Sequence, residues 1–122
     1  MAEGGVKTLL QLEGLAMLAA SVGLYRLIGG DWKLFAILIL APDLIFLGYL
    51  FGPRIGAAAY NAVHTITGPL LLAGWGLAAG QHIALAVSLI WMAHISFDRA
   101  IGFGLKYPSS FNDTHLSSVK IV

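Results

Sequence analysis

Residues 32–51 read WKLFAILILAPDLIFLGYLF, and only Lys33 and Asp43 in this stretch carry a charge. A helix needs about 20 mostly apolar residues to cross the hydrocarbon core of a bilayer. The stretch is far longer than the ~10 residues of a transmembrane barrel strand, and it lacks a strand's alternation of polar and apolar side chains. It therefore predicts a transmembrane helix.

Three further segments have the same length and apolar character, at residues 6–28, 57–78 and 82–103. The connections between the four segments are short, so consecutive helices must be antiparallel neighbours. The sequence thus predicts an all-α integral membrane protein, a four-helix bundle running up-down-up-down over residues 1–103. A polar tail of residues 104–122 follows the bundle.

The composition agrees with a membrane protein of one domain. The 122 residues are 58% hydrophobic and 11% charged, more apolar than a soluble domain of this size can bury. A net charge of +1, without any basic run, argues against nucleic acid as a partner. The absence of cysteine excludes disulfides and thiolate chemistry. The first apolar segment is long enough to span, so we expect a helix there rather than a cleaved signal peptide.

The distribution of Lys and Arg predicts the orientation. The side with the two termini carries five of these residues, against two on the other side. Positive charge accumulates in cytoplasmic loops, so both termini are expected in the cytoplasm. The five are Lys7, Arg54, Arg99, Lys106 and Lys120, and the two are Arg26 and Lys33.

Ionisable side chains within the four segments are the most specific feature of the sequence. Each costs about 2.5–3.5 kcal/mol at mid-membrane on insertion scales. Because the helices alternate in direction, one such group from each helix falls at nearly the same depth, in the inner half of the bilayer. The four residues of this polar layer are Glu13, Asp43, His64 and His94, and Asp98 is a fifth ionisable residue, on the same helix as His94.

Helical spacing and proline positions support one polar site. Asn61, His64 and Gly68 share a face of the third helix, and His94 shares a face of the fourth with Trp91 and Asp98. Pro42 precedes Asp43, and Pro69 lies one turn beyond His64. Proline removes a helical hydrogen bond, so freed carbonyl groups near the layer can supply ligands or bind water.

A shift of 51 positions superimposes the first helical hairpin on the second, with Glu13 on His64 and Asp43 on His94. Such a duplication would create a pseudo-twofold axis along the membrane normal. Glu13 would then oppose His64, and Asp43 would oppose His94. The other identities are few, so the register of the polar residues carries this hypothesis.

A metal centre is the first hypothesis for the layer. Histidine and carboxylate ligands suit zinc, iron or manganese, and the expected ligands are Glu13, Asp43, His64 and His94, with Asp98 as a further one. Asn61-x-x-His64 has the spacing of the Glu-x-x-His motif of di-metal bundles but has Asn in place of Glu. The bundle is too small, and too rich in carboxylates, for a bis-histidine haem. No other cofactor is expected, and the surrounding residues are expected to be Asn61, Trp91, Arg99 and His115.

Three alternatives stay open from the sequence. Metal-free acid–base chemistry would isomerise or hydrolyse a lipophilic small molecule dissolved in the membrane. Transport of protons or ions would require a homo-oligomer to complete the path. Purely structural hydrogen bonding contributes only about 0.6 kcal/mol per contact, which is small beside the insertion cost. The tail is either solvated or folded back with His115 near the layer.

Several short stretches carry a resemblance: PD at 42–43, GYL at 48–50, YNAVH at 60–64, HISFDR at 94–99, GFGLKY at 102–107 and THL at 114–116. Together they resemble a family of small bacterial membrane proteins catalogued as a domain of unknown function, number 4260. The resemblance covers nearly the whole chain and implies a bacterial inner-membrane protein with four spans and lipid neighbours. It implies no activity.

Overall fold

The chain is built from helices. The computed structural model describes residues 4–102, and within this range it contains no strand, so the all-α prediction is confirmed. Five α-helices and one 3₁₀ helix follow one another along the chain: α1 (Gly4–Leu27), α2 (Trp32–Leu38), the 3₁₀ helix η1 (Ala41–Phe51), α3 (Pro53–His64), α4 (Thr67–Ala78) and α5 (His82–Ala100). The tail at 104–122, with His115, lies outside the described residues.

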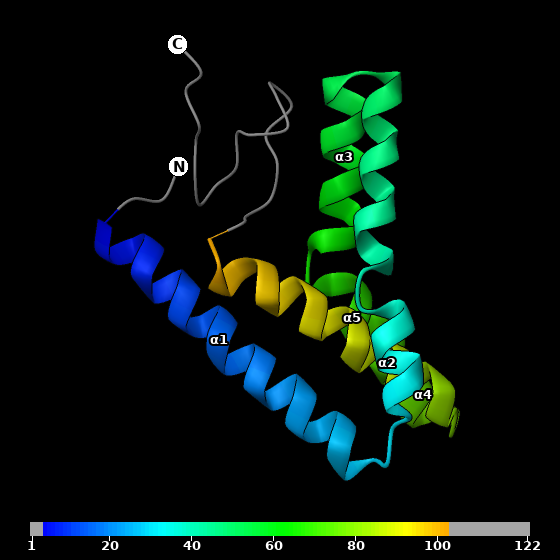
Figure 1. Ribbon diagram of the computed structural model, residues 1–122. Coiled ribbons are helices and arrows are strands. Elements are labelled where there is room, and N and C mark those ends of the chain that lie inside the picture. The colour runs from blue at the N-terminus through cyan, green and yellow to red at the C-terminus, as the bar shows by residue number, and fades with distance from the viewer. Residues whose placement is uncertain (1–3, 103–122) are drawn as a thin grey trace.

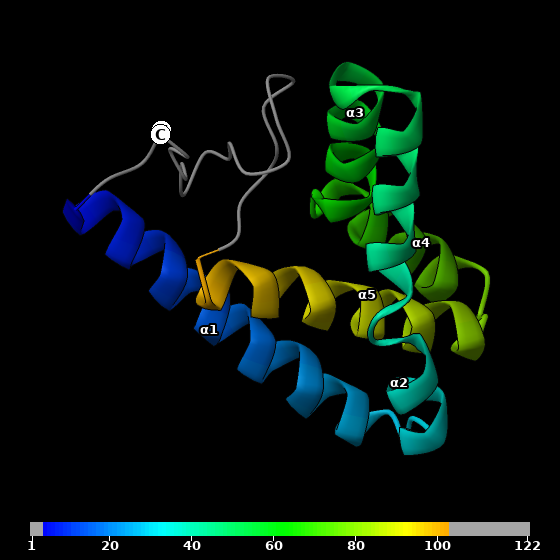
Figure 2. The same ribbon diagram turned by 45° about the horizontal axis from the view of Figure 1, so that its top comes forward.

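The first and last helices form the main packing unit, since α1 lies along α5 (Figures 1 and 2). Gly14 permits their closest approach, because a Cβ atom there would lie 2.6 Å from the Cβ of Arg99. Gln11 donates from its side-chain amide to the carbonyl of Ala100 at 3.3 Å. Small residues allow helix backbones to approach closely in membrane proteins.

The turn from α1 to α2 is fixed by backbone and aromatic contacts. Gly29 takes a left-handed φ of 71°, and the Gly30 amide bonds back to the carbonyl of Tyr25, which closes the helix end. The Asp31 side chain caps α2. The buried Tyr25 ring lies edge-on to those of Trp32 and Phe35, with centroids 5.0 and 5.3 Å away. This cluster anchors the turn beside α5.

Both central apolar segments are interrupted next to a proline. A proline ring clashes with the carbonyl group four residues earlier. For Pro42 that residue is Leu38, where α2 ends, and for Pro69 it is Thr65, whose extended backbone separates α3 from α4. Each proline instead occupies the first turn of the next helix, where proline is tolerated.

The two breaks change the expected architecture. The hairpin of η1 and α3 points away from the α1–α5 pair, whereas α4 packs on α5 (Figures 1 and 2). Inside the hairpin, Gly56 faces the Tyr49 ring, where a Cβ atom would come within 2.3 Å. The second and third segments are therefore broken helices rather than the continuous rods that apolar length predicts.

Three helical stretches are long and apolar enough to cross a membrane: Gly5–Leu27, Trp32–Phe51 and His82–Ala100. The predicted segment 57–78 is not among them, because the extended backbone at Thr65 separates it into α3 and α4, which have only 12 residues each. Large apolar side chains are exposed along the described chain; Leu27, Leu50 and Ile37 are 82%, 81% and 74% accessible. A protein surface of this kind suits a lipid environment better than water.

Candidate metal centre

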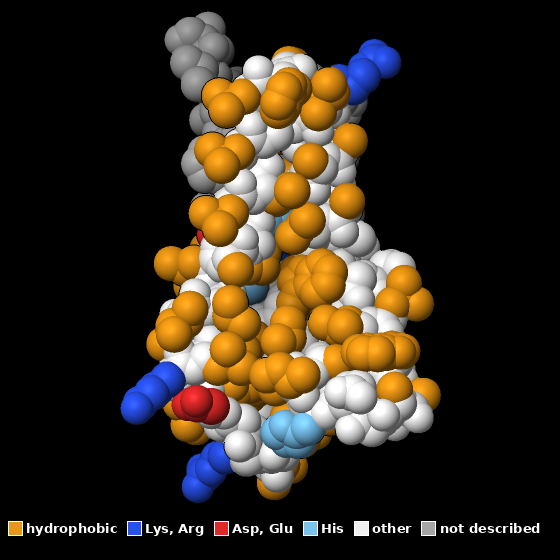
Figure 3. Space-filling model, turned by 90° about the vertical axis from the view of Figure 1, so that its right-hand side faces the viewer, with side chains coloured by type: hydrophobic (Ala, Val, Ile, Leu, Met, Phe, Trp, Pro, Cys, Tyr) orange, Lys and Arg blue, Asp and Glu red, His pale blue; other side chains and the backbone are white. Residues whose placement is uncertain are grey.

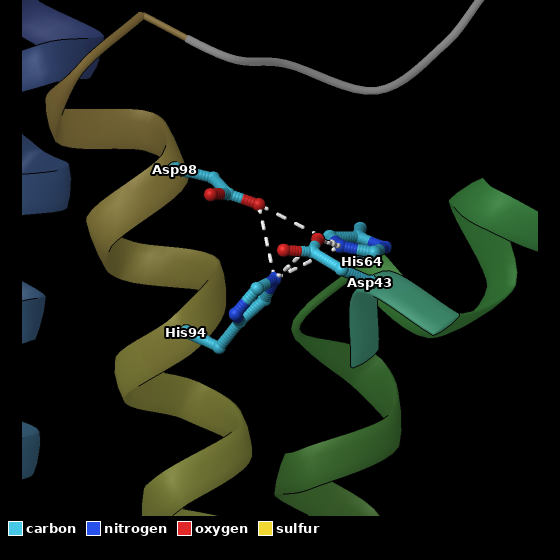
Figure 4. Close-up of side chains that lie close together, drawn as sticks. All are labelled: Asp43, His64, His94 and Asp98. Carbon is cyan, nitrogen blue, oxygen red and sulfur yellow. Dashed lines mark hydrogen bonds and ion pairs between the residues drawn. The ribbon is translucent and has the colours of Figure 1, made fainter. Parts of the chain in front are cut away.

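Four side chains converge where the helix breaks meet α5. These are Asp43, His64, His94 and Asp98, and their ligand atoms all lie within 4.8 Å of one another (Figure 4). The two histidines are 4% and 3% exposed and the Asp98 side chain is 11% exposed, whereas Asp43 is 47% exposed. Three of the four side chains are thus buried, and the Asp43 carboxylate is the accessible one.

The local fold explains how distant residues meet. Asp43 lies in the first turn of η1, immediately after the first break. His64 is the last residue of α3, immediately before the second break. His94 and Asp98 are one turn apart on the buried face of α5. Each break therefore brings one potential ligand to the pair on α5 (Figure 4).

Backbone carbonyl groups determine the tautomer of both histidines. His64 Nδ1 lies 3.0 Å from the carbonyl oxygen of Tyr60, and His94 Nδ1 lies 2.6 Å from that of Ile39. A carbonyl oxygen only accepts hydrogen bonds, so each Nδ1 must donate an N–H. In the neutral imidazole, each Nε2 then carries a lone pair and no proton.

The two Nε2 atoms face each other and the two carboxylates. They lie 3.1 Å apart. Asp43 Oδ1 is 3.3 Å from His64 Nε2 and 3.0 Å from His94 Nε2, and Asp98 Oδ2 is 3.5 and 3.2 Å from the same two atoms. Asp98 Oδ2 is buried without a hydrogen-bond partner among the described residues. With both imidazoles neutral, four lone-pair donors therefore point at one another, an arrangement that could hold a metal ion or a shared proton.

The distances match a four-coordinate metal ion. Zinc bonds of 2.0–2.2 Å to nitrogen and oxygen place tetrahedral ligands about 3.3 Å apart. Five of the six ligand pairs are separated by 3.0–3.5 Å. Carbonyl groups that hold Nδ1 are also the usual orienting partners of metal-bound histidines. The residues thus have both the chemistry and the spacing of a metal site.

Side chains of α5 bind the carbonyl groups that the second break leaves free. The Trp91 indole donates to the carbonyl of Val63 at 2.6 Å, and the Arg99 guanidinium donates to that of His64 at 3.3 Å. The Trp91 ring also covers Gly68, where a Cβ atom would lie 2.5 Å away. These contacts hold the C-terminal end of α3 against α5.

The structure places the predicted site residues differently. Asp43, His64, His94 and Asp98 are brought together, and Trp91 and Arg99 surround them. Asn61 lies on α3, half-buried, and its carbonyl accepts from the Thr65 amide at the break. Glu13 is exposed on α1 and does not join the group, so the predicted opposition of Glu13 and His64 is not seen, although Asp43 does lie opposite His94. His115 lies outside the described residues.

Two groups that position the histidines were not predicted from the sequence. The Ile39 carbonyl holds His94, and Pro42 three residues later was the available signal for a freed acceptor there. The Tyr60 ring stacks on His64 with centroids 3.8 Å apart and an interplanar angle of 3°. Its position four residues before His64, on the same helix face, could have revealed it.

Comparison with known proteins yields a family but no activity. A family model described as "Domain of unknown function (DUF4260)" matches residues 7–119, which is most of the chain. No curated protein and no solved structure shows significant similarity to the chain. The geometry of the polar group therefore has to carry the functional interpretation.

Proposed function

The chain belongs to the DUF4260 family, and we propose that it is an integral membrane protein that binds one divalent metal ion between two histidines and two aspartates. The unprotonated Nε2 atoms of His64 and His94, 3.1 Å apart, carry this proposal. Without a cation, their lone pairs would repel each other and the neighbouring carboxylates. Zinc, iron and manganese all accept such a ligand set.

The charge balance also supports a divalent ion. Two carboxylates and two neutral imidazoles carry a net charge of −2, which is costly to bury in an apolar environment. When all four side chains bind a divalent cation, its charge of +2 cancels the −2 of the two carboxylates. The same count disfavours a monovalent ion, which would leave one negative charge at a site whose histidines are almost fully buried.

The surface supports placement in a membrane. The face in Figure 3 is covered mainly by apolar side chains, while charged side chains stand out at its upper and lower ends. An apolar belt between two charged ends is the pattern of a membrane-spanning protein. We further propose the bacterial inner membrane and cytoplasmic termini, supported by the Lys and Arg distribution. We also propose four crossings, supported by three helical stretches of spanning length and by the apolar sequence of the fourth predicted segment, 57–78.

The broken segments fit this proposal. Irregular backbone at membrane depth is tolerated where protein or a polar cavity surrounds it. Here the carbonyl groups of Ile39, Val63 and His64 each accept a hydrogen bond from an α5 side chain. The two breaks can therefore lie within the membrane without leaving these acceptors unpaired.

Elemental analysis of the purified protein tests the proposal. We expect about one equivalent of divalent metal in the wild type and less than about a tenth of an equivalent in His64→Ala and His94→Ala, because each removes a ligand. His82→Ala is the matched control: His82 is exposed and lies at the start of α5, bonded to the Ile28 carbonyl. Equal metal content in all four proteins would refute the metal centre.

Metal-free acid–base chemistry is the competing outcome of the same experiment. It requires a proton, rather than a metal ion, between the two Nε2 atoms. It would be supported by a wild-type protein that contains no metal and gains none on incubation with zinc, iron or manganese salts. If His64→Ala and His94→Ala lose the metal while His82→Ala keeps it, the two histidines are ligands.

A further inference from the structure

A cavity opens directly onto the proposed metal ligands. Its volume is about 380 Å³, and three of its lining residues are Asp43, His94 and Asp98. This volume is within the range of small-molecule sites. The remaining lining residues are apolar: Ile39, Leu40, Phe97 and Ile101.

The apolar part of the cavity continues to the outer surface. Leu40, Phe97 and Ile101 are 66%, 49% and 48% exposed, so the wall that they form reaches the apolar exterior. Asp43 is the only one of the four ligands with a largely accessible side chain. A molecule that approaches through this opening therefore passes apolar side chains first and meets the metal on its Asp43 side.

The metal can accept one more ligand on that side. His64, His94 and Asp98 hold it from the buried side and Asp43 from the accessible side, and a four-coordinate site of this kind can expand to five-coordinate when an exogenous oxygen binds. The metal is already neutralised by the two aspartates. A charged head group would add net negative charge in an apolar site, whereas a hydroxyl or carbonyl oxygen would not.

We propose that this cavity binds an uncharged, oxygen-bearing amphiphile, with its hydroxyl or carbonyl oxygen on the metal and its hydrocarbon chain leading out between Leu40 and Phe97. The inference rests on the proposed metal centre. It specifies the chemical class of the ligand: a long-chain alcohol or carbonyl compound dissolved in the bilayer, rather than a fatty acid or a water-soluble anion.

Cobalt-substituted protein in lipid nanodiscs provides the test, because the visible spectrum of cobalt reports a new oxygen ligand. Dodecanol is expected to change the spectrum saturably, dodecane to leave it unchanged, and dodecanoate to bind at least about tenfold more weakly than dodecanol. Tighter binding of dodecanoate, or an equal effect of dodecane, would overturn the assignment of a neutral oxygen ligand.

A matched pair of variants tests the route. Leu40→Trp places a bulky ring at the opening and should weaken dodecanol binding at least about tenfold, while the cobalt spectrum without ligand stays the same. Leu44→Trp is the control, since Leu44 is equally exposed, at 65%, but does not line the cavity. Equal effects of the two variants would refute the route.

The two proposals fail separately. If cobalt binds and dodecanol has no effect on its spectrum, the amphiphile is excluded and the metal centre stands. If no cobalt binds to the wild-type protein, the metal centre fails and the amphiphile site fails with it.

Discussion

His94 of α5 donates a hydrogen bond from Nδ1–H to the carbonyl of Ile39. This carbonyl is free of a helical hydrogen bond because Pro42 interrupts the helix there. This contact links the break to the chemistry of the site. It fixes the imidazole so that Nε2 points at His64 and at both carboxylates. The proline and the histidine, 52 positions apart in sequence, thus act as one unit.

Pro42→Ala should weaken metal binding. The new amide and the more regular helix would compete for the Ile39 carbonyl, and His94 would lose its orienting partner. Loss of such a partner costs about tenfold to a hundredfold in metal affinity, measurable by competition with a chelating dye. Pro53→Ala is the control, since Pro53 lies at the first position of α3, where no backbone N–H is needed for the helix. Equal metal affinity of the two variants would show that the helix break at Pro42 does not contribute to metal binding.

The two aspartates should differ in importance. Asp98→Asn places an amide in the buried part of the site and should lower metal affinity by more than about a hundredfold, the upper end of what an orienting partner contributes. Asp43→Asn should have a smaller effect, about tenfold, because the half-exposed position lets water replace the carboxylate. The same chelator competition measures both. A larger loss in Asp43→Asn would reverse the assigned order.

Trp91→Phe should destabilise the fold rather than abolish the site. The indole N–H that binds the Val63 carbonyl is lost, while most of the ring contact with Gly68 is kept. An unsatisfied buried carbonyl costs about 1–3 kcal/mol, which the thermal unfolding midpoint in detergent would report. Trp75→Phe, at a 57% exposed position, should have little effect. Equal midpoints for the two variants would deny the Trp91 hydrogen bond a stabilising role.

Gly68→Ala and Gly74→Ala form a second pair, both in α4. A methyl group at position 68 would lie 2.5 Å from the Trp91 ring, whereas position 74 has no neighbouring atom within 4 Å. The first substitution should lower the unfolding midpoint. The second should leave it unchanged or raise it, because Ala is favoured over Gly by about 1 kcal/mol in helices. Destabilisation by Gly74→Ala alone would contradict the packing of α4 on α5.

The sequence predicted the helical class and four side chains that the structure brings together, because these depend on composition, depth and helix face. Asp43, His64, His94 and Asp98 were selected in this way. Glu13 shows the limit of that reasoning. Depth along a helix does not determine which face turns inward, and α1 turns the face of Gly14 towards α5 while Glu13 stays exposed.

The breaks were harder to predict than the site. Pro42 and Pro69 indicated loosened backbone, but their effect depends on whether the freed carbonyl groups find other donors. In this fold His94, Trp91 and Arg99 of α5 supply those donors. Because the contacts join segments that are distant in sequence, no local pattern distinguishes a mild kink from a complete interruption.

X-ray absorption spectroscopy of the zinc-loaded protein shows directly whether His64 and His94 bind the metal ion. We predict a first shell of four nitrogen and oxygen atoms at about 2.0 Å, with the outer-shell scattering of two imidazole rings. His94→Ala should reduce the imidazole contribution to one ring, whereas His82→Ala should leave the spectrum unchanged. A wild-type spectrum without imidazole scattering would show that neither histidine binds the metal ion.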